Sequence, residues 1–207
     1  MEVTSTKHKI LVCATDLFAS KGYTESTIRE LAAATGIKEA SLYNHFSSKN
    51  AILEYILKEH SEIHDKSFFY DRLHTLKENP TAEGILSCMT LVFPEGKEEY
   101  YLKQLYVILQ EQHRNPSVRE FVAQQFILNN EKAVKTLIHT LIEYGILRKD
   151  TDADFWVKTH SSLLYAFSSR SLLGIGDNEK GYTGLGLSQL LLNMYEIMLK
   201  TCGEQII

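Results

Sequence analysis

Polar side chains able to hydrogen-bond to nucleic acid gather in one short segment near the amino terminus. Tyr43, Asn44 and His45 follow one another there and offer a phenol, an amide and an imidazole. An asparagine amide can pair bidentately with adenine in a major groove about 12 Å wide. Small residues just before these side chains let the backbone approach base edges, and lysines bracket the segment. The small and basic members of this set are Lys38, Ala40, Ser41 and Lys49.

A pair of histidines at helical spacing is the other feature that could do chemistry. His60 and His64 stand four residues apart beside Glu59, a spacing that allows two imidazoles to chelate a metal ion. Two ligands on an exposed helix rarely suffice, so solvated histidines are the preferred interpretation. No HExxH, GxSxG, P-loop or GxGxxG spacing occurs. We therefore expect no catalytic residues, no metal site and no cofactor.

The composition of the 207 residues fits a globular protein, with 44% hydrophobic and 23% charged residues. Its three cysteines, Cys13, Cys88 and Cys202, form no CxxC spacing, which argues against a disulfide framework or a zinc site. No signal peptide or membrane span is predicted, so the cytoplasm is the expected location. The net charge of −4 disfavours a polyanionic partner for the whole chain, but residues 1–50 carry +1 and residues 51–207 carry −5.

Helical periodicity runs through the chain, and strand patterns are unconvincing throughout, so the fold class is all-α. Thr27 and Glu30 form a capping-box pattern at the start of the second helix, and Gly36 ends that helix. A short turn then leads to a brief third helix. The second helix, the turn and the third helix together make a helix-turn-helix arrangement. The early helices are predicted at residues 7–20, 27–36 and 40–44, and from a cap at Ser47 or Ser48 to about residue 63.

Longer helices are expected beyond residue 66, and the last of them is apolar on nearly every side. Such a helix needs cover on more than one face, which favours a dimer that forms a four-helix bundle from residues 154–173 and 185–200 of each chain. The later helices are predicted at residues 82–93, 98–113, 117–144, 152–167 and 185–200. The predicted dimer contacts are Leu163, Phe167, Leu187, Leu191, Met194 and Met198.

The first fifty residues resemble the DNA-binding domain of the TetR family of bacterial transcription regulators. The resemblance is carried, in order, by ATDLFASKGY (residues 14–23), TIRELA (27–32), GIKEASLYNHF (36–46) and Lys49, about a quarter of the chain. It implies a helix-turn-helix DNA-binding domain at residues 1–48 and an all-helical ligand-binding and dimerisation domain at residues 49–207. It also implies a homodimer whose recognition helices enter successive major grooves of a double-stranded DNA operator, usually to repress a nearby promoter.

The resemblance implies roles for individual positions. Thr27 matches a phosphate contact at the start of the second helix, and Tyr43 and His45 match a phosphate-contacting aromatic residue and histidine. Lys49 matches the basic residue at the start of the fourth helix. The positions that match residues reading bases or adjacent backbone are Lys38, Glu39, Ala40 and Asn44.

Some of these positions have two interpretations. Glu39 departs from the family pattern, and its carboxylate either accepts from a cytosine amino group or interacts favourably with the helix amino terminus. Asn44 either pairs with adenine or touches only solvent or phosphate. Taken singly, Tyr43 could pack against the first helix and His45 could cap the recognition helix. In register with the family pattern, DNA contact is the preferred interpretation for both.

Aromatic residues concentrate after residue 50, where 17 of the 21 occur. They either form the hydrophobic core or line a pocket between helices for a small apolar or amphipathic ligand, with His160 or Tyr165 as its polar anchor. The predicted pocket residues are Phe93, Tyr101, Leu105, Phe126, His160 and Tyr165.

The preferred function is a dimeric, sequence-specific transcriptional repressor that a small-molecule inducer releases from DNA. In this mechanism the inducer moves the two recognition helices away from the half-site repeat of about 34 Å. The alternative is an all-helical protein that binds or sequesters a small molecule without any DNA-dependent role. An enzyme is the third option.

Overall fold

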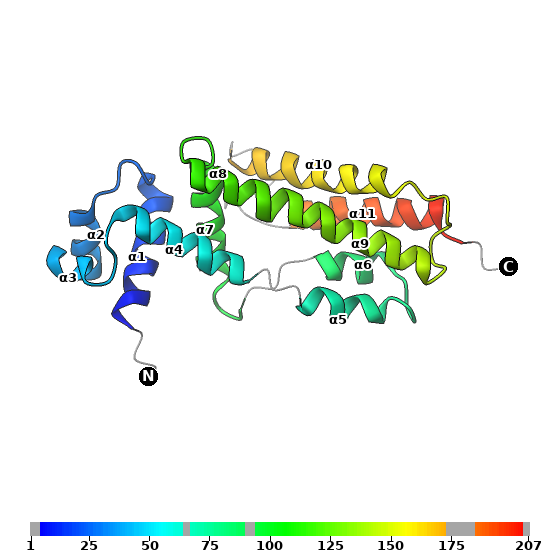
Figure 1. The fold of residues 1–207 in the computed structure, drawn as a ribbon, viewed down its shortest axis with the longest axis horizontal. Helices are drawn as coiled ribbons and strands as arrows, with labels where there is room; N and C mark the ends of the chain where they lie inside the picture. Colours follow the sequence, from blue (N-terminus) through cyan, green and yellow to red (C-terminus); the bar gives the residue numbers. More distant parts are fainter. Residues whose placement is uncertain (1–4, 64–66, 90–93, 173–184, 205–207) are drawn as a thin grey trace. The chain divides into compact units, whose positions relative to one another are not determined.

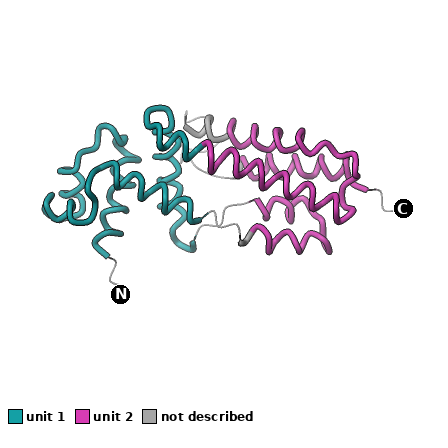
Figure 2. Tube along the Cα trace, in the orientation of Figure 1, with its two compact units in different colours: residues 1–64, 92–122 teal, residues 65–91, 123–207 magenta. Residues whose placement is uncertain are grey.

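The computed structural model describes residues 5–63, 67–89, 94–172 and 185–204. All regular structure in these ranges is helical, apart from one antiparallel bridge between Leu147 and Gly203 (Figure 1). The predicted all-α fold is confirmed. The chain forms two compact units, one of residues 1–64 and 92–122 and the other of residues 65–91 and 123–207 (Figure 2). No helix in the described part of the chain is both long and apolar enough to span a bilayer.

Four helices begin the first unit, and side-chain caps from Ser5, Thr27 and Ser48 fix where three of them start. The Thr27 hydroxyl accepts from the Glu30 amide at 3.2 Å, and the Ser48 hydroxyl accepts from the Ala51 amide at 3.0 Å. The predicted cap at Thr27 is therefore confirmed, and of the two predicted candidates Ser47 and Ser48 the cap is Ser48. The four helices are α1 (Thr6–Lys21), α2 (Ile28–Thr35), α3 (Glu39–Tyr43) and α4 (Lys49–Glu62).

A small apolar core joins these four helices. Ile10, Ala14 and Phe18 lie at four-residue spacing on α1 and are buried. Leu42 is the buried residue of α3 and has no exposed surface. Because Leu42 fixes the inner side of so short a helix, the remaining side chains of α3 are directed away from the core.

Two later helices, α7 (Glu98–Glu111) and α8 (Pro116–Val122), complete the first unit. On α4, the Glu59 carboxylate accepts hydrogen bonds from the Tyr100 hydroxyl at 2.5 Å and from the Gln104 amide at 2.7 Å. Lys103 also lies 2.7 Å from Asp16 of α1. Side chains of α7 thus hold both α1 and α4. The first compact unit extends beyond residue 48, and the division into functional domains at 1–48 and 49–207 remains a prediction.

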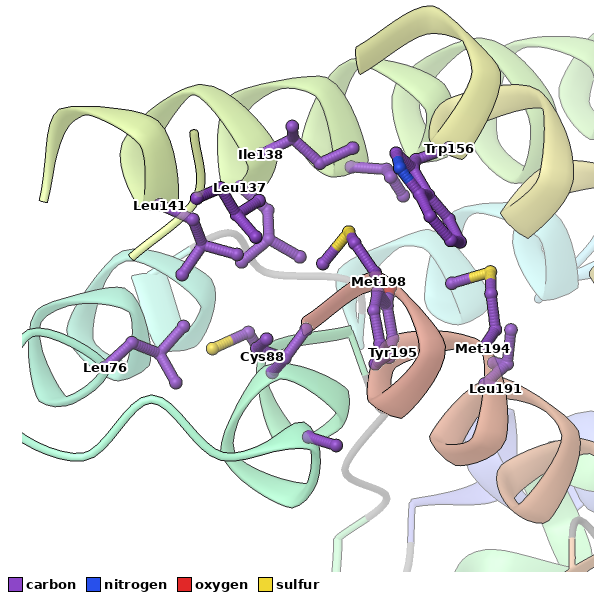
Figure 3. Close-up of a cluster of buried hydrophobic side chains, with 14 of the residues drawn as sticks. Leu76, Cys88, Leu137, Ile138, Leu141, Trp156, Leu191, Met194, Tyr195 and Met198 are labelled. Atoms are coloured by element: carbon purple, nitrogen blue, oxygen red, sulfur yellow. The ribbon is translucent and has the colours of Figure 1, made fainter. Parts of the chain in front are cut away.

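The second unit is a helical assembly around one hydrophobic core. Leu137, Ile138 and Leu141 of α9 face this core, together with Trp156 of α10 and Tyr195 of α11 (Figure 3). Burial of these large side chains is the main favourable term for the folding of this unit. Its helices are α5 (Ser67–Thr75), α6 (Ala82–Met89), the π-helix η1 (Ala123–Leu128), α9 (Asn129–Glu143), α10 (Ala153–Leu172) and α11 (Leu185–Cys202).

The continuous helix expected at residues 117–144 is divided in the structure. It consists of α8, η1 and α9 in succession. The hydrogen bonds of a π-helix span five residues instead of four, so the segment shifts the register of the side chains that follow it. The apolar spacing before and after residues 123–128 therefore belongs to two different buried faces, one in each unit.

The sequence-based choice of dimer contacts is wrong for three residues of α11. Leu191, Met194 and Met198 lie in the core of their own chain, against α6 and the other helices of the second unit. Leu163 and Leu187 are partly buried against the same core. A side chain already covered by its own chain has no surface left for a partner. The side chain of Phe167 lies outside the described residues.

Candidate nucleic-acid interface

A glycine turn sets the direction in which the chain enters α3. Gly36 adopts the left-handed conformation, with φ 75° and ψ 30°, which a residue with a Cβ adopts only at a cost. The Gly36 amide donates to the Ala33 carbonyl at 3.1 Å, and the Ile37 amide donates to the Ala32 carbonyl at 3.0 Å. These two bonds satisfy the last carbonyls of α2 and turn the chain sharply. The helix-turn-helix predicted from the sequence is present.

The outer side of α3 carries the polar residues that the sequence singled out. Tyr43 keeps 50% of its surface exposed, which is unusual for so large an aromatic side chain. Asn44 and His45 follow it and are exposed, and Ser41 is half-buried. The exposed residues that precede them are Lys38, Glu39 and Ala40. The structure thus brings a phenol, an amide, an imidazole and a lysine together on α3 and the residues that flank it.

Glu39 is the first residue of α3, and Lys38 provides no side-chain cap there. A carboxylate is stabilised near the free amides of a helix amino terminus. This position suits the interpretation in which Glu39 serves its own helix. The alternative, recognition of a cytosine amino group, is equally compatible with an exposed carboxylate.

At the start of α2, Thr27 is engaged within the protein. Its backbone amide and its hydroxyl each donate to Glu30 Oε2 at 2.9 Å, and Lys21 Nζ lies 2.5 Å from Glu30 Oε1. The bond from Lys21, followed by those from the Thr27 hydroxyl and amide, lowers the pKa of Glu30 to about 2. Glu30 is therefore an anion whose charge is offset by Lys21, and it orders the end of α2 that carries Thr27.

The side chain of Lys49 is also held by hydrogen bonds within the first unit. Its ammonium donates to the carbonyl oxygens of Tyr23 at 2.7 Å, Thr24 at 3.3 Å and Ser26 at 2.9 Å, and it lies 4.3 Å from the centre of the Tyr23 ring. Burial lowers the pKa of Lys49, and the charges of Glu111 and Glu25 act in the opposite direction. Three carbonyls match the three protons of an ammonium. The DNA contact predicted for Lys49 would require it to leave these oxygens, whereas its observed contacts fix the loop before α2 to the start of α4.

Other basic residues of the first unit differ in their contacts within the protein and in their exposure to solvent. Lys7 Nζ lies 3.9 Å from the Tyr55 ring centre and 5.3 Å from that of Phe46, so it is held by cation–π contacts. Lys9 and Arg29 are exposed. Arg29 was missed as a candidate phosphate contact, although its place two residues after Thr27 could have indicated it.

The residues predicted to line a ligand pocket are divided between the two units. Tyr101 is buried and Leu105 is half-buried in the first unit. In the second unit, His160 is buried, Phe126 is half-buried on η1, and Tyr165 keeps 56% of its surface exposed. Neither unit holds the whole set, and Phe93 lies outside the described residues.

The histidine pair gives no sign of a metal site. His60 has no exposed surface and its ring centre lies 6.4 Å from that of Tyr101, so the prediction of a solvated side chain is wrong for His60. His64 lies outside the described residues. Across the ranges that the structure describes, no three His, Cys, Asp or Glu side chains are placed to hold a metal ion together.

Comparison with known proteins agrees with this geometry. The family model of bacterial regulatory proteins of the tetR family matches residues 10–56, which include α2, the glycine turn and α3. IcaR of Staphylococcus aureus, a negative transcriptional regulator of a biofilm operon, is 46% identical over 52 residues, 25% of this chain and 28% of IcaR. The transcriptional repressor KstR2 of Mycolicibacterium smegmatis is 25% identical over 156 residues, 72% of this chain and 71% of KstR2.

The fold is shared over nearly the whole chain with solved structures. A protein from Saccharomonospora viridis, described as a transcriptional regulator and crystallised with choline, superposes with a TM-score of 0.64 at 22% identity. The match covers 96% of this chain and 98% of that one. At this identity the likeness concerns the fold, while the match to the family model concerns the DNA-binding helices themselves. Over residues 10–56 this chain therefore matches the bacterial regulatory proteins of the tetR family.

Proposed function

We propose that this protein is a dimeric, sequence-specific DNA-binding transcriptional regulator, a repressor that a small molecule releases from its operator. The observation that carries the proposal is the polar face of α3, which is exposed around a fully buried Leu42 and set by the left-handed turn at Gly36. A short helix held in this way can enter a major groove without rearranging its scaffold. A DNA target also implies that the protein acts in the cytoplasm.

The exposed residues divide into two kinds of DNA contact. Tyr43, His45 and Lys38 supply a hydroxyl, an imidazole and an ammonium for phosphates, which position the protein on the duplex. Asn44 reads a base edge, and Ala40 allows the backbone to approach closely. Arg29 and Thr27 supply further phosphate contacts at the start of α2. The remaining predicted contacts, Glu39, Ser41 and Lys49, act at the edge of the interface or by orienting it.

Two tyrosines of nearly equal exposure provide the test. Tyr43 on α3 is 50% exposed and Tyr70 on α5 is 52% exposed. With DNA that flanks the protein's own gene, Tyr43→Ala should weaken binding about tenfold or more in a gel-shift titration, the equivalent of about 1.4 kcal/mol. Tyr70→Ala should bind as the unaltered protein does. Equal DNA affinity of both variants would contradict the proposal that α3 contacts DNA.

The homodimer is proposed to form through the outer faces of α10 and α11. Phe155 and Tyr165 on α10 and Leu190 and Ile197 on α11 are large apolar or aromatic side chains that the chain leaves exposed. Leu190 and Ile197 lie seven residues apart and so share one face of α11. Two such helices from each chain can pack as a four-helix bundle across a two-fold axis.

The second unit is proposed to hold the inducer. Its helices enclose an apolar core that also contains the buried polar residue His160. The protein from Saccharomonospora viridis shares this fold and was crystallised with choline, which supports small-molecule binding by proteins of this architecture. A ligand that binds better to the conformation with misplaced recognition helices would release the dimer from DNA.

A further inference from the structure

Ion pairs define how α9 and α10 lie against each other in the second unit. Lys135 of α9 lies 2.7 Å from Asp154 of α10, and Lys158 of α10 lies 2.9 Å from Glu131 of α9. The residue with the higher number on α9 thus pairs with the residue of lower number on α10, so the two helices run antiparallel. Asn130 precedes Glu131 on α9, and Ser161 follows Lys158 on α10. Asn130 and Ser161 therefore belong to the same end of the helix pair.

Three polar atoms near this end are buried without a hydrogen-bond partner among the described residues. They are Asn130 Oδ1, Ser161 Oγ and His160 Nε2. The side chain of His160 is 1% exposed. Buried polar atoms in folded proteins nearly always have partners, because an unpaired one loses its bonds to water without replacement. Three such atoms on two adjacent helices offer hydrogen-bonding groups to a bound molecule.

The orientation of His160 is fixed from its other side. His160 Nδ1 lies 2.9 Å from the hydroxyl of Tyr195, which has no exposed surface. Burial lowers the pKa of His160 to about 4, so the imidazole is neutral near pH 7. When the Tyr195 hydroxyl donates to Nδ1, the ring proton resides on Nε2, which is then a donor.

The surroundings of these atoms are apolar. Trp156 and Val157 precede His160 on α10, Met194 lies beside Tyr195 on α11, and all three are buried. The nearest charged side chains along the helices, Glu131 and Lys158, are paired with each other. Among the described residues an ionised group would find no opposite charge to pair with here, whereas a neutral group with both a donor and an acceptor would find partners.

The π-helix lies directly before this site in the chain. Residues 123–128 form η1, and α9 begins at Asn129, next to Asn130. Single turns of π-helix inside α-helices are frequent at functional sites. Its position beside Asn130 is an observation independent of the unpartnered atoms.

We infer that Asn130, His160 and Ser161 form the polar recognition site for the effector, which is an uncharged, mainly apolar molecule that carries a carbonyl and a hydroxyl group. His160 Nε2 donates to the carbonyl, Asn130 Oδ1 accepts from the hydroxyl, and Ser161 pairs with either. This inference rests on the proposed function for its regulatory meaning, but the site itself is testable without DNA.

The test uses the full-length protein and three ten-carbon probes: 4-hydroxy-2-decanone, 2-decanone and decanoate. In calorimetric titrations the hydroxyketone should bind about tenfold more tightly than the ketone, the gain expected from one further hydrogen bond, and decanoate should bind least. Tightest binding by decanoate, or no binding by the hydroxyketone, would overturn the assignment of ligand class.

Neighbouring residues provide matched controls for the site. Ser161→Ala and Asn130→Ala should each weaken hydroxyketone binding about tenfold, without lowering the melting temperature, because each removes an atom that has no partner in the structure. Ser162→Ala alters an exposed side chain, and Asn129→Ala removes bonds to Gln124 and Gln125; both should leave the affinity for the probe unchanged. Equal affinities across all four variants would overturn the site.

Operator binding separates this inference from the proposed function. All four variants should bind operator DNA as the unaltered protein does when no probe is present. If hydroxyketone binding depends on Ser161 and Asn130 but the protein never binds DNA, the effector site is supported and the proposed regulatory function is contradicted. If the protein binds DNA but the Ser161 and Asn130 variants keep full affinity for the hydroxyketone, the proposed function is supported and the effector site is contradicted.

Discussion

Lys49 shows what residue type indicates and what only folding reveals. The sequence places a positive charge at the start of the fourth helix, and the resemblance to the TetR family implies that it meets DNA. In the structure its ammonium contacts the carbonyl oxygens of Tyr23, Thr24 and Ser26. Backbone carbonyls are present at every residue, so no sequence pattern predicts that three of them converge on one ammonium group. The charge could be predicted, but its partners could not.

Removal of this ammonium should loosen the scaffold of the DNA-binding helices. Lys49→Met keeps the length of the side chain but leaves three carbonyl oxygens without their donor, which should lower the free energy of unfolding by about 1–2 kcal/mol. Urea unfolding followed by circular dichroism measures the change. Lys58→Met is the control, since Lys58 is an exposed residue of the same helix. A Lys49→Met protein as stable as the control would show that the three contacts contribute nothing.

At the level of elements, helix limits followed from local signals. The cap at Thr27 and the stop at Gly36 involve residues within a few positions of each other, so sequence alone predicts them, and it narrows the cap of α4 to Ser47 or Ser48. No sequence pattern predicts the helix α5 (Ser67–Thr75), and the apolar periodicity predicts ordinary α-helix where η1 lies. The π-helix depends on which faces of the flanking helices become buried, and that is a property of the whole fold.

Two glycine turns of the same kind allow the recognition turn to be tested. Gly36 ends α2 and Gly145 follows α9, both have positive φ, and a Cβ at either would meet no atom within 4 Å. Alanine at either position should therefore cost about 1 kcal/mol of stability through backbone strain alone. Only Gly36→Ala should also reduce operator affinity, because only Gly36 sets the direction of α3.

Thermal unfolding and a DNA titration on both variants measure these effects. Loss of DNA binding in Gly145→Ala to the same degree as in Gly36→Ala would mean that general destabilisation, and not the direction of α3, is responsible.

For the whole molecule, sequence indicated that the last helix is covered on several sides but not by which chain. Periodicity predicts Leu191, Met194 and Met198 as dimer contacts, yet the chain itself buries them. Periodicity identifies apolar faces, and it carries no information on whether a face meets the same chain or a second copy. Leu190 and Ile197, which remain exposed, are the better candidates for the dimer contact.

A charge on the outer face of α11 should separate the protomers. Ile197 is 53% exposed on α11, and Leu128 is 54% exposed on η1. Ile197→Glu should yield a folded monomer at micromolar concentration in analytical ultracentrifugation, because a buried, unpaired carboxylate is costly in an interface. Leu128→Glu should remain dimeric. A dimeric Ile197→Glu protein, or a monomeric Leu128→Glu protein, would place the interface elsewhere.

The central claim is that α3 reads DNA sequence as part of a dimeric regulator. The most direct measurement is a fluorescence-anisotropy titration of the unaltered protein with DNA flanking its own gene and with a scrambled duplex of equal length, over a range of salt concentrations. We predict affinity for the flanking DNA at least about a thousandfold higher than for the scrambled duplex, and a steep fall in both with salt. Equal affinity for the two duplexes at every salt concentration would contradict the claim.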